Sequence, residues 1–408
     1  MTPQVKQRIE QIRHGEVPEG YKRTKAGIVP KEWEEKRIGD VLTQRKTLMC
    51  ISEDAPLLSF TIEEGVIDPA DKKSNKRDFL IKDMATKKFA LTEVGDIIFN
   101  PANLKFGAIH RNNLRRGVVS PIYGIFYGEQ DSIFMGYLLH NQRFIDYAKI
   151  YTEGTVEKLK TLKADTFLKL KITLPSLSEQ KKIVEILTAQ DKLIELQNKK
   201  IEQLKKLKQS YVQSMLPQKG SNLPKLRFRS FSGDWNQNKL GDEVTEMVAG
   251  GDVDRTLLVK KGTYPVIANA LNDDGIVGYY ENTFRVKAPA VTITGRGDVG
   301  HAKARFANFT PIVRLLAIQS KHDVLFLENA INTLHIIVES TGVPQLTIPQ
   351  LSQYKLMFPS SLEEERAIGT VLGGIDRLIA LNQHKLNEEK QKKKALMQLL
   401  LTGIARTK

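Results

Sequence analysis

The chain has 408 residues, with 62 Lys and Arg against 47 Asp and Glu, which gives a formal net charge of +15. This length predicts more than one domain, and a hydrophobic content of 41% is enough to build packed cores, which excludes a largely disordered chain. The single cysteine, Cys50, excludes a disulfide scaffold and favours a reducing cytoplasm. No apolar run reaches membrane-spanning length, so we expect neither export nor a membrane partner. The excess of positive charge favours nucleic acid as the partner, although basic surfaces are also often simply solvated.

The first half of the chain predicts an arm, a mixed region and a long helix. Residues 1–32 form the arm, in which Val5–His14 has the period of a helix, and we expect this arm to dock near the final helix of the chain. Residues 33–175 predict a mixed region, with a buried strand at Asp96–Phe99 and one short amphipathic helix at Met135–Tyr147. Residues 176–217 then predict a long helix, with Ser176 or Ser178 as its N-cap.

The second half repeats this order. Residues 218–234 are punctuated by Pro, Gly and Ser, which is typical of a linker. Residues 235–359 predict a second mixed region, with a buried strand at Pro289–Thr294. Residues 360–403 predict a second long helix, with Ser360 or Ser361 as its N-cap.

An internal repeat connects the two halves. Residues 180–216 align without a gap to residues 365–401, at an offset of 185 and with 11 identities in 37 positions. A second patch opens each half, because Trp33 and the following Ile38-Gly39-Asp40 recur as Trp235 and Leu240-Gly241-Asp242. The chain is therefore a duplication of patch, mixed region and helix.

Both long helices carry a heptad pattern. The predicted coiled-coil core positions are Ile183, Leu187, Ile194, Ile201, Leu204, Ile368, Leu372, Ile375, Ile379 and Leu386. Gln197 and Asn382 occupy equivalent core positions, where a buried polar pair can fix the register of two helices. The alternative, in which each apolar stripe faces a globular core, stays open at this point.

The connection between the helices predicts their direction. A compact region of this size has its entry and its exit close together compared with the length of such a helix, so the second helix starts where the first one ends. We therefore predict an α+β fold in which two mixed α/β regions are separated by two long antiparallel coiled-coil helices. The arrangement has approximate two-fold symmetry, and the arm closes the chain into a near-circular path.

Two short motifs resemble catalytic or cofactor signatures without completing them. Gly295–Gly300 spells G-x-G-x-x-G, but the following residues alternate with the period of a strand, so we predict a tight turn that glycine permits instead of a dinucleotide site. Asn100-Pro101-Ala102-Asn103 is similar to the N-P-P-Y/F signature of adenine methyltransferases, but it lacks the second proline and the aromatic residue. We interpret it as a polar loop.

Clusters of basic and amide side chains are the candidates for DNA contact, since Arg can bind guanine and Asn can bind adenine through two hydrogen bonds. The candidates are Lys72, Lys73, Lys76, Arg77, Asn103, Lys105, Arg111, Asn112, Asn113, Arg296, Lys303 and Arg305. The alternative for each charge cluster is a loop that is simply exposed to solvent.

No signature of catalysis or of metal binding is present in the sequence. The histidines lack metal-ligand spacing, and there is neither a phosphate loop nor a nucleophile elbow. We therefore predict no catalytic residues and no metal site.

The duplicated pattern resembles the specificity (S) subunits of type I restriction-modification systems. The resemblance lies in Leu174–Ile194 and Phe358–Ile379, in the ending Leu399–Gly403, and in Gly20-Tyr21-Lys22, Ile28-Val29-Pro30 and Trp33 near the front. It covers essentially the whole chain. One departure is that Pro217-Gln218-Lys219 follows the first helix where Leu-Thr-Gly ends the second.

The resemblance implies a non-catalytic subunit in the cytoplasm of a prokaryote. Each mixed region would be a target recognition domain for one half of a bipartite site in double-stranded DNA, and the helices would set the spacer and dock two modification (methyltransferase) subunits. Restriction subunits would join through these. The chain itself would bind no cofactor, whereas the methyltransferase would use S-adenosylmethionine and the restriction partner ATP and Mg²⁺. Two alternatives remain: a coiled-coil interaction scaffold without sequence-specific DNA binding, and an enzyme with an unfamiliar site.

Overall fold

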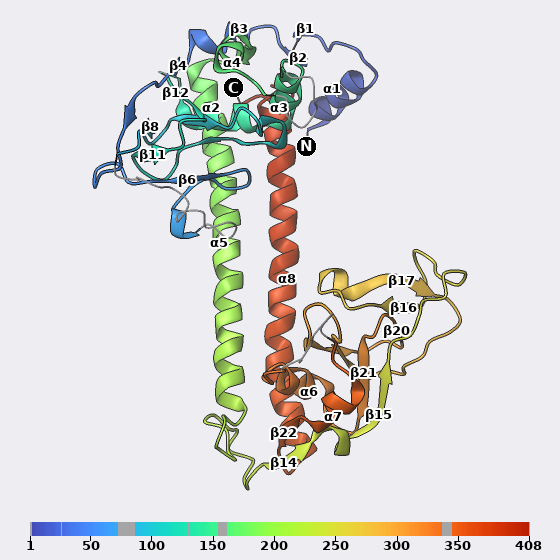
Figure 1. Cartoon of the computed structure of the whole chain (residues 1–408). Coiled ribbons are helices and arrows are strands. Elements are labelled where there is room, and N and C mark those ends of the chain that lie inside the picture. Colours follow the sequence, from blue (N-terminus) through green and yellow to red (C-terminus); the bar gives the residue numbers. More distant parts are fainter. Residues whose placement is uncertain are drawn as a thin grey trace. The chain divides into compact units, whose positions relative to one another are not determined.

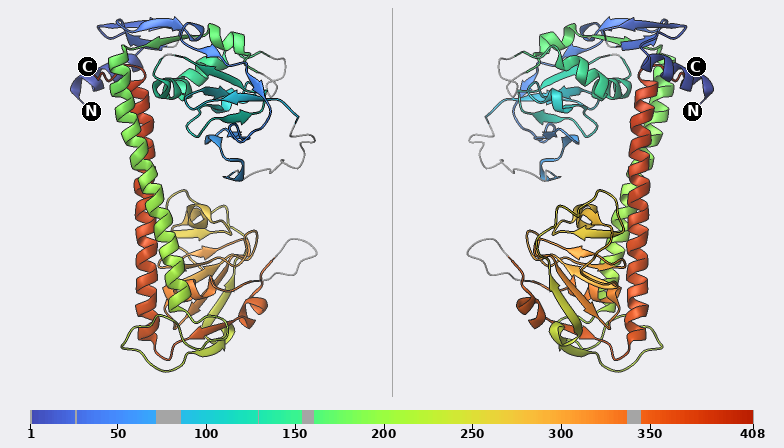
Figure 2. Two further views of the ribbon diagram at one scale, coloured as in Figure 1. Left: turned by 90° about the vertical axis from the view of Figure 1, so that its left-hand side faces the viewer. Right: turned by 90° about the vertical axis from the view of Figure 1, so that its right-hand side faces the viewer.

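The computed structural model of the chain describes residues 2–25, 27–71, 86–128, 130–153, 161–336 and 345–407. It divides into two compact units, here called unit 1 (Met1–Glu195 with Asn387–Lys408) and unit 2 (Leu196–Leu386). Both chain ends belong to unit 1. Each unit contains strands and short helices beside one segment of each of two long helices (Figures 1 and 2).

The long helices are α5 (Leu177–Met215) and α8 (Leu362–Leu400), each of 39 residues. Each begins at a serine cap. The backbone N–H of Glu179 lies 3.3 Å from Ser176 Oγ, and that of Glu364 lies 3.2 Å from Ser361 Oγ. Each cap gives a hydrogen-bond partner to an amide that has none inside the helix. The acidic residues of the first turn interact favourably with the positive end of the helix dipole. Of the alternatives that the sequence left open, Ser176 and Ser361 are therefore the caps.

The two long helices run antiparallel within each unit. In unit 1, the Gln190 side-chain amide donates to the Glu389 carboxylate at 2.5 Å. In unit 2, the Gln197 amide donates to Asn382 Oδ1 at 2.8 Å, and Lys208 Nζ lies 2.7 Å from Asp376 Oδ2. In unit 1, Ile183 and Leu187 near the start of α5 also pack in one core with Leu400 at the end of α8. Rising numbers on α5 thus meet falling numbers on α8 in each unit, as the sequence predicts.

Unit 1 contains a four-stranded sheet of order β10-β9-β12-β4, a three-stranded sheet of order β11-β8-β5, and three strand pairs, β1-β2, β3-β13 and β6-β7. Its elements are α1 (Pro3–Arg13), β1 (Tyr21–Thr24), β2 (Gly27–Pro30), β3 (Glu34–Arg37), η1 (Ile38–Asp40), β4 (Thr43–Gln44), β5 (Leu48–Met49), β6 (Ser59–Thr61), β7 (Gly65–Ile67), η2 (Pro69–Asp71), β8 (Phe89–Thr92), β9 (Ile97–Phe99), η4 (Leu104–Phe106), β10 (Ile109–Arg111), β11 (Gly117–Val119), β12 (Gly124–Tyr127), α2 (Ser132–His140), α3 (Gln142–Lys149), α4 (Ala164–Lys169) and β13 (Lys171–Leu174).

Unit 2 contains a four-stranded sheet of order β15-β21-β18-β19, a three-stranded sheet of order β17-β16-β20, and the pair β14-β22. Its elements are β14 (Asn236–Lys239), η6 (Leu240–Asp242), β15 (Val244–Ala249), β16 (Tyr264–Ile267), η7 (Asn272–Gly275), β17 (Ile276–Tyr280), β18 (Ala290–Ile293), β19 (Ala302–Arg305), β20 (Thr310–Pro311), β21 (Leu316–Ser320), α6 (Val324–Ile331), α7 (Ile348–Gln353) and β22 (Lys355–Phe358).

The four-stranded sheets of the two units are equivalent. Written from the other edge, the unit 2 order β19-β18-β21-β15 matches β10-β9-β12-β4 strand for strand in chain order. In addition, α2 packs against β10 in unit 1 and α6 packs against β19 in unit 2. The repeat detected at the helices therefore extends into the mixed regions, where the sequences no longer align.

The glycine of each repeated patch is explained by a close approach. Gly39 lies in η1 and Gly241 in η6, where α4 and α7 pack against them. A Cβ atom on Gly39 would lie 3.2 Å from the Leu168 carbonyl oxygen, and one on Gly241 would lie 2.8 Å from Ser352 Cβ. Glycine at this position lets a short helix cover the start of each unit in the same way.

One helix prediction was wrong in its extent. The sequence suggested one helix over residues 135–147, whereas the structure has α2 and α3 with Asn141 between them. Asn141 is extended, and its side-chain oxygen accepts the Arg143 N–H at 2.9 Å. It therefore starts a second helix, because an asparagine side chain can replace the missing backbone partner at a helix N-terminus.

The ends of the long helices belong to the cores of the two units. Ile183 and Leu187 of α5 pack in the unit 1 core, and Ile368 and Leu372 of α8 pack in the unit 2 core. All four are buried. Apolar heptad positions near each helix start therefore hold a sheet domain, so the interpretation that the stripes face a globular core is correct for these turns.

In each unit, an arginine forms a salt bridge with a glutamate in the first turn of a long helix. In unit 1, Arg406 Nε and Nη2 lie 2.7 and 2.8 Å from the two carboxylate oxygens of Glu179. In unit 2, Arg227 Nε and Nη2 lie 2.7 and 2.8 Å from those of Glu364. Glu179 and Glu364 are equivalent in the repeat and are both buried. The hydrogen bonds to these carboxylates raise the pKa of both guanidinium groups.

The chain ends meet beside the Arg406–Glu179 pair. The Tyr21 hydroxyl donates to the Gly403 carbonyl oxygen at 2.7 Å, and Arg8 Nη1 donates to the Ile404 carbonyl oxygen at 3.0 Å. The N-terminal arm therefore contacts the residues that follow α8.

We predict that Arg227→Ala destabilises unit 2 by about 3 kcal/mol, because it leaves the buried Glu364 carboxylate without its cation. Chemical denaturation measures this loss. The matched control is Arg366→Ala, because Arg366 is exposed on the same helix and its removal should change the free energy of unfolding by less than about 0.5 kcal/mol. Equal effects of the two substitutions would contradict a structural role for the Arg227–Glu364 pair.

Candidate nucleic-acid interface

The equivalent sheets present two equivalent hairpin loops, and both short motifs of the sequence lie in them. Asn100–Asn103 lies between β9 and β10, and Gly295–Gly300 lies between β18 and β19. The strands that carry these loops match between units, but the loop sequences differ completely. A common framework with different loops is the arrangement by which proteins carry different binding specificities on one fold.

The unit 2 loop is a tight turn, as the sequence predicts. Gly297 and Gly300 have φ values of +72° and +93°, which favour glycine. The chain continues as strand β19 and not as a helix. The loop thus has no helix N-terminus to bind a pyrophosphate, and the G-x-G-x-x-G pattern is a turn.

The unit 1 loop is anchored at one side chain and exposed at another. Leu104 is 1% exposed and packs in the core, whereas Phe106, two residues later, is 63% exposed. Lys105 Nζ lies 5.2 Å from the centre of the Phe106 ring. The N–H of Phe106 donates to the Asn103 carbonyl oxygen at 2.9 Å, so this part of the loop is a hydrogen-bonded turn.

The structure separates the candidate residues of unit 1 into two groups. Asn103 and Lys105 precede β10, whereas Arg111, Asn112 and Asn113 lie at its far end. The Asn112 side chain is 0% exposed, and its amide donates to Thr92 Oγ1 and to the Arg115 carbonyl oxygen. These contacts give Asn112 a structural role, and we do not retain it as a base-reading residue.

Arg111 and its neighbours are partly engaged within unit 1. Arg111 Nε donates to Ser132 Oγ at 3.0 Å, and Nη1 donates to Asn113 Oδ1. The neighbouring His110 contributes no charge, because burial and the adjacent His140 lower its pKa to about 4. Positive charge at this end of β10 therefore comes from arginine.

The candidates of unit 2 lie close together on one hairpin. Arg296 donates to Gln345 Oε1 at 2.9 Å, and Lys303 forms an ion pair with Asp274. Arg305 Nε donates to Thr292 Oγ1 at 3.0 Å, and burial lowers the pKa of this guanidinium. The hydrogen bond from Lys303 holds the pKa of Asp274 below its usual range.

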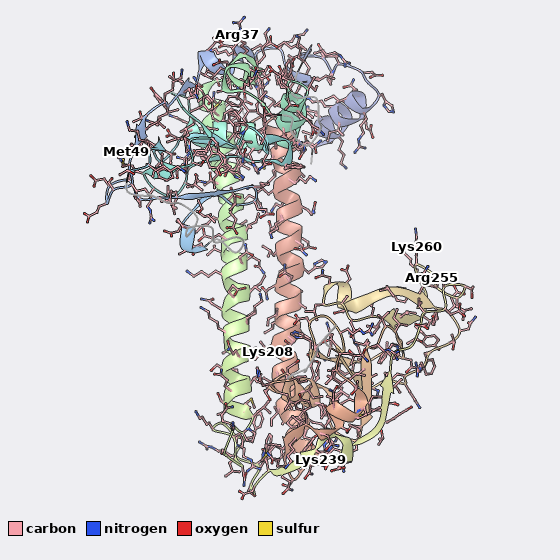
Figure 3. The ribbon with its side chains drawn as sticks, in the orientation of Figure 1. Arg37, Met49, Lys208, Lys239, Arg255 and Lys260 are labelled. Carbon is pink, nitrogen blue, oxygen red and sulfur yellow. The ribbon has the colours of Figure 1, made fainter. Side chains whose placement is uncertain are left out.

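Lys72, Lys73, Lys76 and Arg77 lie outside the described residues. Two basic residues that are not among the predicted contacts, Arg255 and Lys260, lie between β15 and β16. Both are exposed and point outward in Figure 3. Only Lys261 is a basic neighbour of either residue, so their spacing alone gives little signal.

The predicted coiled-coil positions differ in how far their side chains are buried. The buried members are Ile183, Leu187, Ile201, Ile368, Leu372, Ile375 and Leu386, and the half-buried members are Ile194, Leu204 and Ile379.

Two lysines at heptad positions are bound to repeated aspartates. Lys393 Nζ lies 2.5 Å from Asp191 Oδ1 in unit 1, and Lys208, labelled on α5 in Figure 3, is bound to Asp376 of α8 in unit 2. Each partner of one pair is equivalent to a partner of the other at the offset of 185. Part of the positive charge of the chain thus lies in ion pairs between the two long helices.

Each long helix also carries an exposed pair of leucines. Leu193 and Leu196 on α5 are 49% and 50% exposed, and Leu378 and Leu381 on α8 are 48% and 52% exposed. The pairs are identical at the offset of 185. These four side chains are therefore apolar surface that the helix pair itself does not cover.

The described residues contain no group of three or more His, Cys, Asp or Glu side chains that could hold a metal ion. In the same part of the chain, no helix has both the length and the apolar character needed to cross a membrane.

A family model for the type I restriction modification DNA specificity domain matches the chain twice, over residues 30–206 and 232–391. The chain belongs to this family. Its duplicated halves are two specificity domains, and the family suggested by the repeat is confirmed.

Named relatives agree with this assignment. The chain is 24% identical to the putative type I restriction enzyme MjaX specificity subunit of Methanocaldococcus jannaschii, over 96% of this chain and 97% of that protein. It is likewise 24% identical to the type I restriction enzyme MjaVIII specificity subunit of the same organism, with the same coverage.

The fold is also found in a solved specificity subunit. The type I restriction-modification system S subunit from M. genitalium superposes with a TM-score of 0.61 at 14% identity, covering 90% of this chain and 96% of that one. This likeness confirms the predicted fold class, with mixed α/β regions and two long helices.

Proposed function

We propose that this chain is the non-catalytic subunit that gives a type I restriction-modification complex its DNA specificity. The observation that carries the proposal is the presence of two specificity domains on one chain, whose equivalent sheets carry different hairpin loops. The target recognition domains span residues 33–175 and 235–359, and each binds one half of a bipartite site in double-stranded DNA. Different loops imply different half-sites.

The DNA contacts fall on the hairpin loops and the basic residues around them. In unit 2 these are Arg296, Lys303 and Arg305, with Arg255 and Lys260 as phosphate contacts. In unit 1 they are Lys105, Arg111 and Asn113, with Asn103 at the loop. Major-groove edges distinguish all four base pairs, whereas contacts to phosphate position the protein without reading sequence.

The helix pair sets the distance between the half-sites and binds the modification subunits. Two identical exposed leucine pairs, one on each long helix, support two copies of one partner. In this scheme the methyltransferase subunits bind S-adenosylmethionine and modify the adenines, and restriction subunits with ATP and Mg²⁺ join through them. The complex acts in the cytoplasm of a prokaryote.

Binding to DNA tests the central part of the proposal. Methylated adenines mapped in a host that expresses this chain with its methyltransferase define a motif, which we expect to be bipartite. The purified complex should then prefer that duplex to one with scrambled half-sites by at least about 10³-fold at moderate salt. Equal affinity for both duplexes would favour the alternative, a scaffold without sequence-specific binding.

Single substitutions test the role of Lys303 in the same assay. Lys303→Ala should reduce the salt slope of the logarithm of affinity by about 1, because one phosphate contact is lost. Lys36→Ala is the control, because Lys36 pairs with Glu34 on a strand outside the four-stranded sheet. An unchanged slope for Lys303→Ala would remove Lys303 from the interface.

The exposed leucines predict how many methyltransferase subunits each chain binds. We expect the combined substitutions Leu378→Ser and Leu381→Ser to reduce the methyltransferase subunits bound per chain from two to one, measured as the mass of the complex in solution. Leu257→Ser is the control, because Leu257 is equally exposed, at 50%, but lies in a loop of unit 2. A complex that retains both subunits would contradict docking at this leucine pair.

A further inference from the structure

The two units attach their sheet domains to the long helices by the same construction. α2 and α6 begin at the caps Asp131 and Asp323, whose carboxylates each accept two backbone N–H groups of the first turn. The residue before each cap contacts the first turn of a long helix. It is Gln130 in unit 1 and His322 in unit 2.

The contact in unit 1 is neutral. Gln180 on α5 donates from Nε2 to Gln130 Oε1 at 3.2 Å and to the Pro175 carbonyl oxygen at 3.0 Å. Gln180 is 1% exposed. Neither glutamine titrates, so the charge of this contact does not change with pH.

The equivalent contact in unit 2 is ionisable. Glu365 takes the place of Gln180 at the offset of 185. His322 Nδ1 lies 2.7 Å from Glu365 Oε1, and Nε2 lies 2.9 Å from Glu243 Oε2. Since ionised carboxylates only accept hydrogen bonds, both ring nitrogens donate, and only the imidazolium form does so.

The two carboxylates that contact His322 have further partners. Glu243 also accepts from Asn238 Nδ2 at 2.6 Å and pairs with Lys321 at 3.3 Å, while Glu365 accepts the backbone N–H of Asp323 at 3.0 Å. On the remaining side, the Phe358 ring lies 4.4 Å from the imidazole, centre to centre. The charged groups around His322 are thus Glu243, Glu365, Lys321 and the cap Asp323.

The balance of these contacts determines the direction of the pH effect. Burial of the ring opposes protonation, but the hydrogen bonds and charges of Glu365 and Glu243 outweigh it and raise the pKa of His322 above 6.5. A raised pKa means that the stabilisation is complete below 6.5 and is lost as pH rises through the folded-state value. Above that value, two carboxylates face a neutral ring that can donate to only one of them.

We propose that the cluster of Glu243, His322 and Glu365 makes the attachment of the unit 2 sheet domain to α8 weaken at alkaline pH, while the Gln130–Gln180 contact keeps the unit 1 attachment independent of pH. Because this rests on the proposed function, the consequence for DNA is that affinity for the half-site read by unit 2 declines first as pH rises.

Hydrogen–deuterium exchange of the intact chain between pH 6 and pH 9, corrected for the intrinsic pH dependence of exchange, tests the proposal. The opening constant of α6 and of the first turn of α8 should rise by up to about tenfold per pH unit between 6.5, the ordinary value of a histidine ring, and the raised folded-state pKa of His322, and should level off above it. The corresponding segments of unit 1, α2 and the first turn of α5, should not change. Equal pH dependence of α2 and α6 would overturn the proposal.

A double substitution gives unit 2 the residues of unit 1. His322→Gln with Glu365→Gln should abolish the pH dependence of α6, since Glu243 retains Asn238 and Lys321. Lys321→Ala is the control and should leave the dependence in place. A double variant that keeps the wild-type dependence would contradict the proposal.

One further measurement keeps the test decisive. If the double variant does not fold, the titration of the His322 ring by NMR of the unsubstituted chain decides, and a pKa at or below 6.5 overturns the proposal. The exchange experiment contains no DNA, so its failure is distinct from a failure of the proposed function.

Discussion

The contact of Gln197 with Asn382 fixes the register of the two long helices on which both units are built. The Gln197 amide donates to both the Asn382 side-chain oxygen and its backbone carbonyl oxygen, at 2.8 and 3.0 Å. Sliding either helix by one turn would remove both hydrogen bonds of the half-buried Gln197 amide, at a cost of about 1 kcal/mol each. The two residues are equivalent in the repeat, so the same contact results when the halves of the chain are exchanged.

The other helix contacts follow from this register but are not all symmetric. The pairs Lys393–Asp191 and Lys208–Asp376 are equivalent, one in each unit. The contact of Gln190 with Glu389 has no polar counterpart, because the equivalent positions are Ile375 and Leu204. The same difference occurs at the sheet junctions, where a neutral Gln pair in unit 1 corresponds to an ionised cluster in unit 2. The duplication therefore preserves the framework and allows each half its own chemistry.

The sequence predicted what depends on local pattern. The helices, their serine caps and the glycine turn at residues 295–300 all follow from spacing and side-chain chemistry within a few residues. Local pattern did not predict the salt bridges of Arg227 and Arg406. The two arginines follow their helices at different distances, so they do not align at the offset of the repeat. The cluster around His322 was also missed, since its carboxylates come from segments far apart in the chain.

For the candidate interface, the sequence located loops but not contacts. It selected the hairpin residues by charge, and the structure then showed that Asn112 is buried and that Lys303 is bound to Asp274. Such pairings are decided by strands and loops that are not adjacent in sequence. The net charge of +15 is likewise divided between loops and ion pairs that join the helices.

The most direct test of the account is the length of the DNA spacer when the helix pair is extended. Inserting one heptad at the same layer of α5 and α8 lengthens the pair by about 10 Å, which corresponds to about 3 base pairs of DNA. Mapping methylated adenines in cells should then show the same two half-sites separated by a spacer that is longer by about that number. Unchanged half-sites with an unchanged spacer would contradict the claim that the helices set the distance between the two recognition domains.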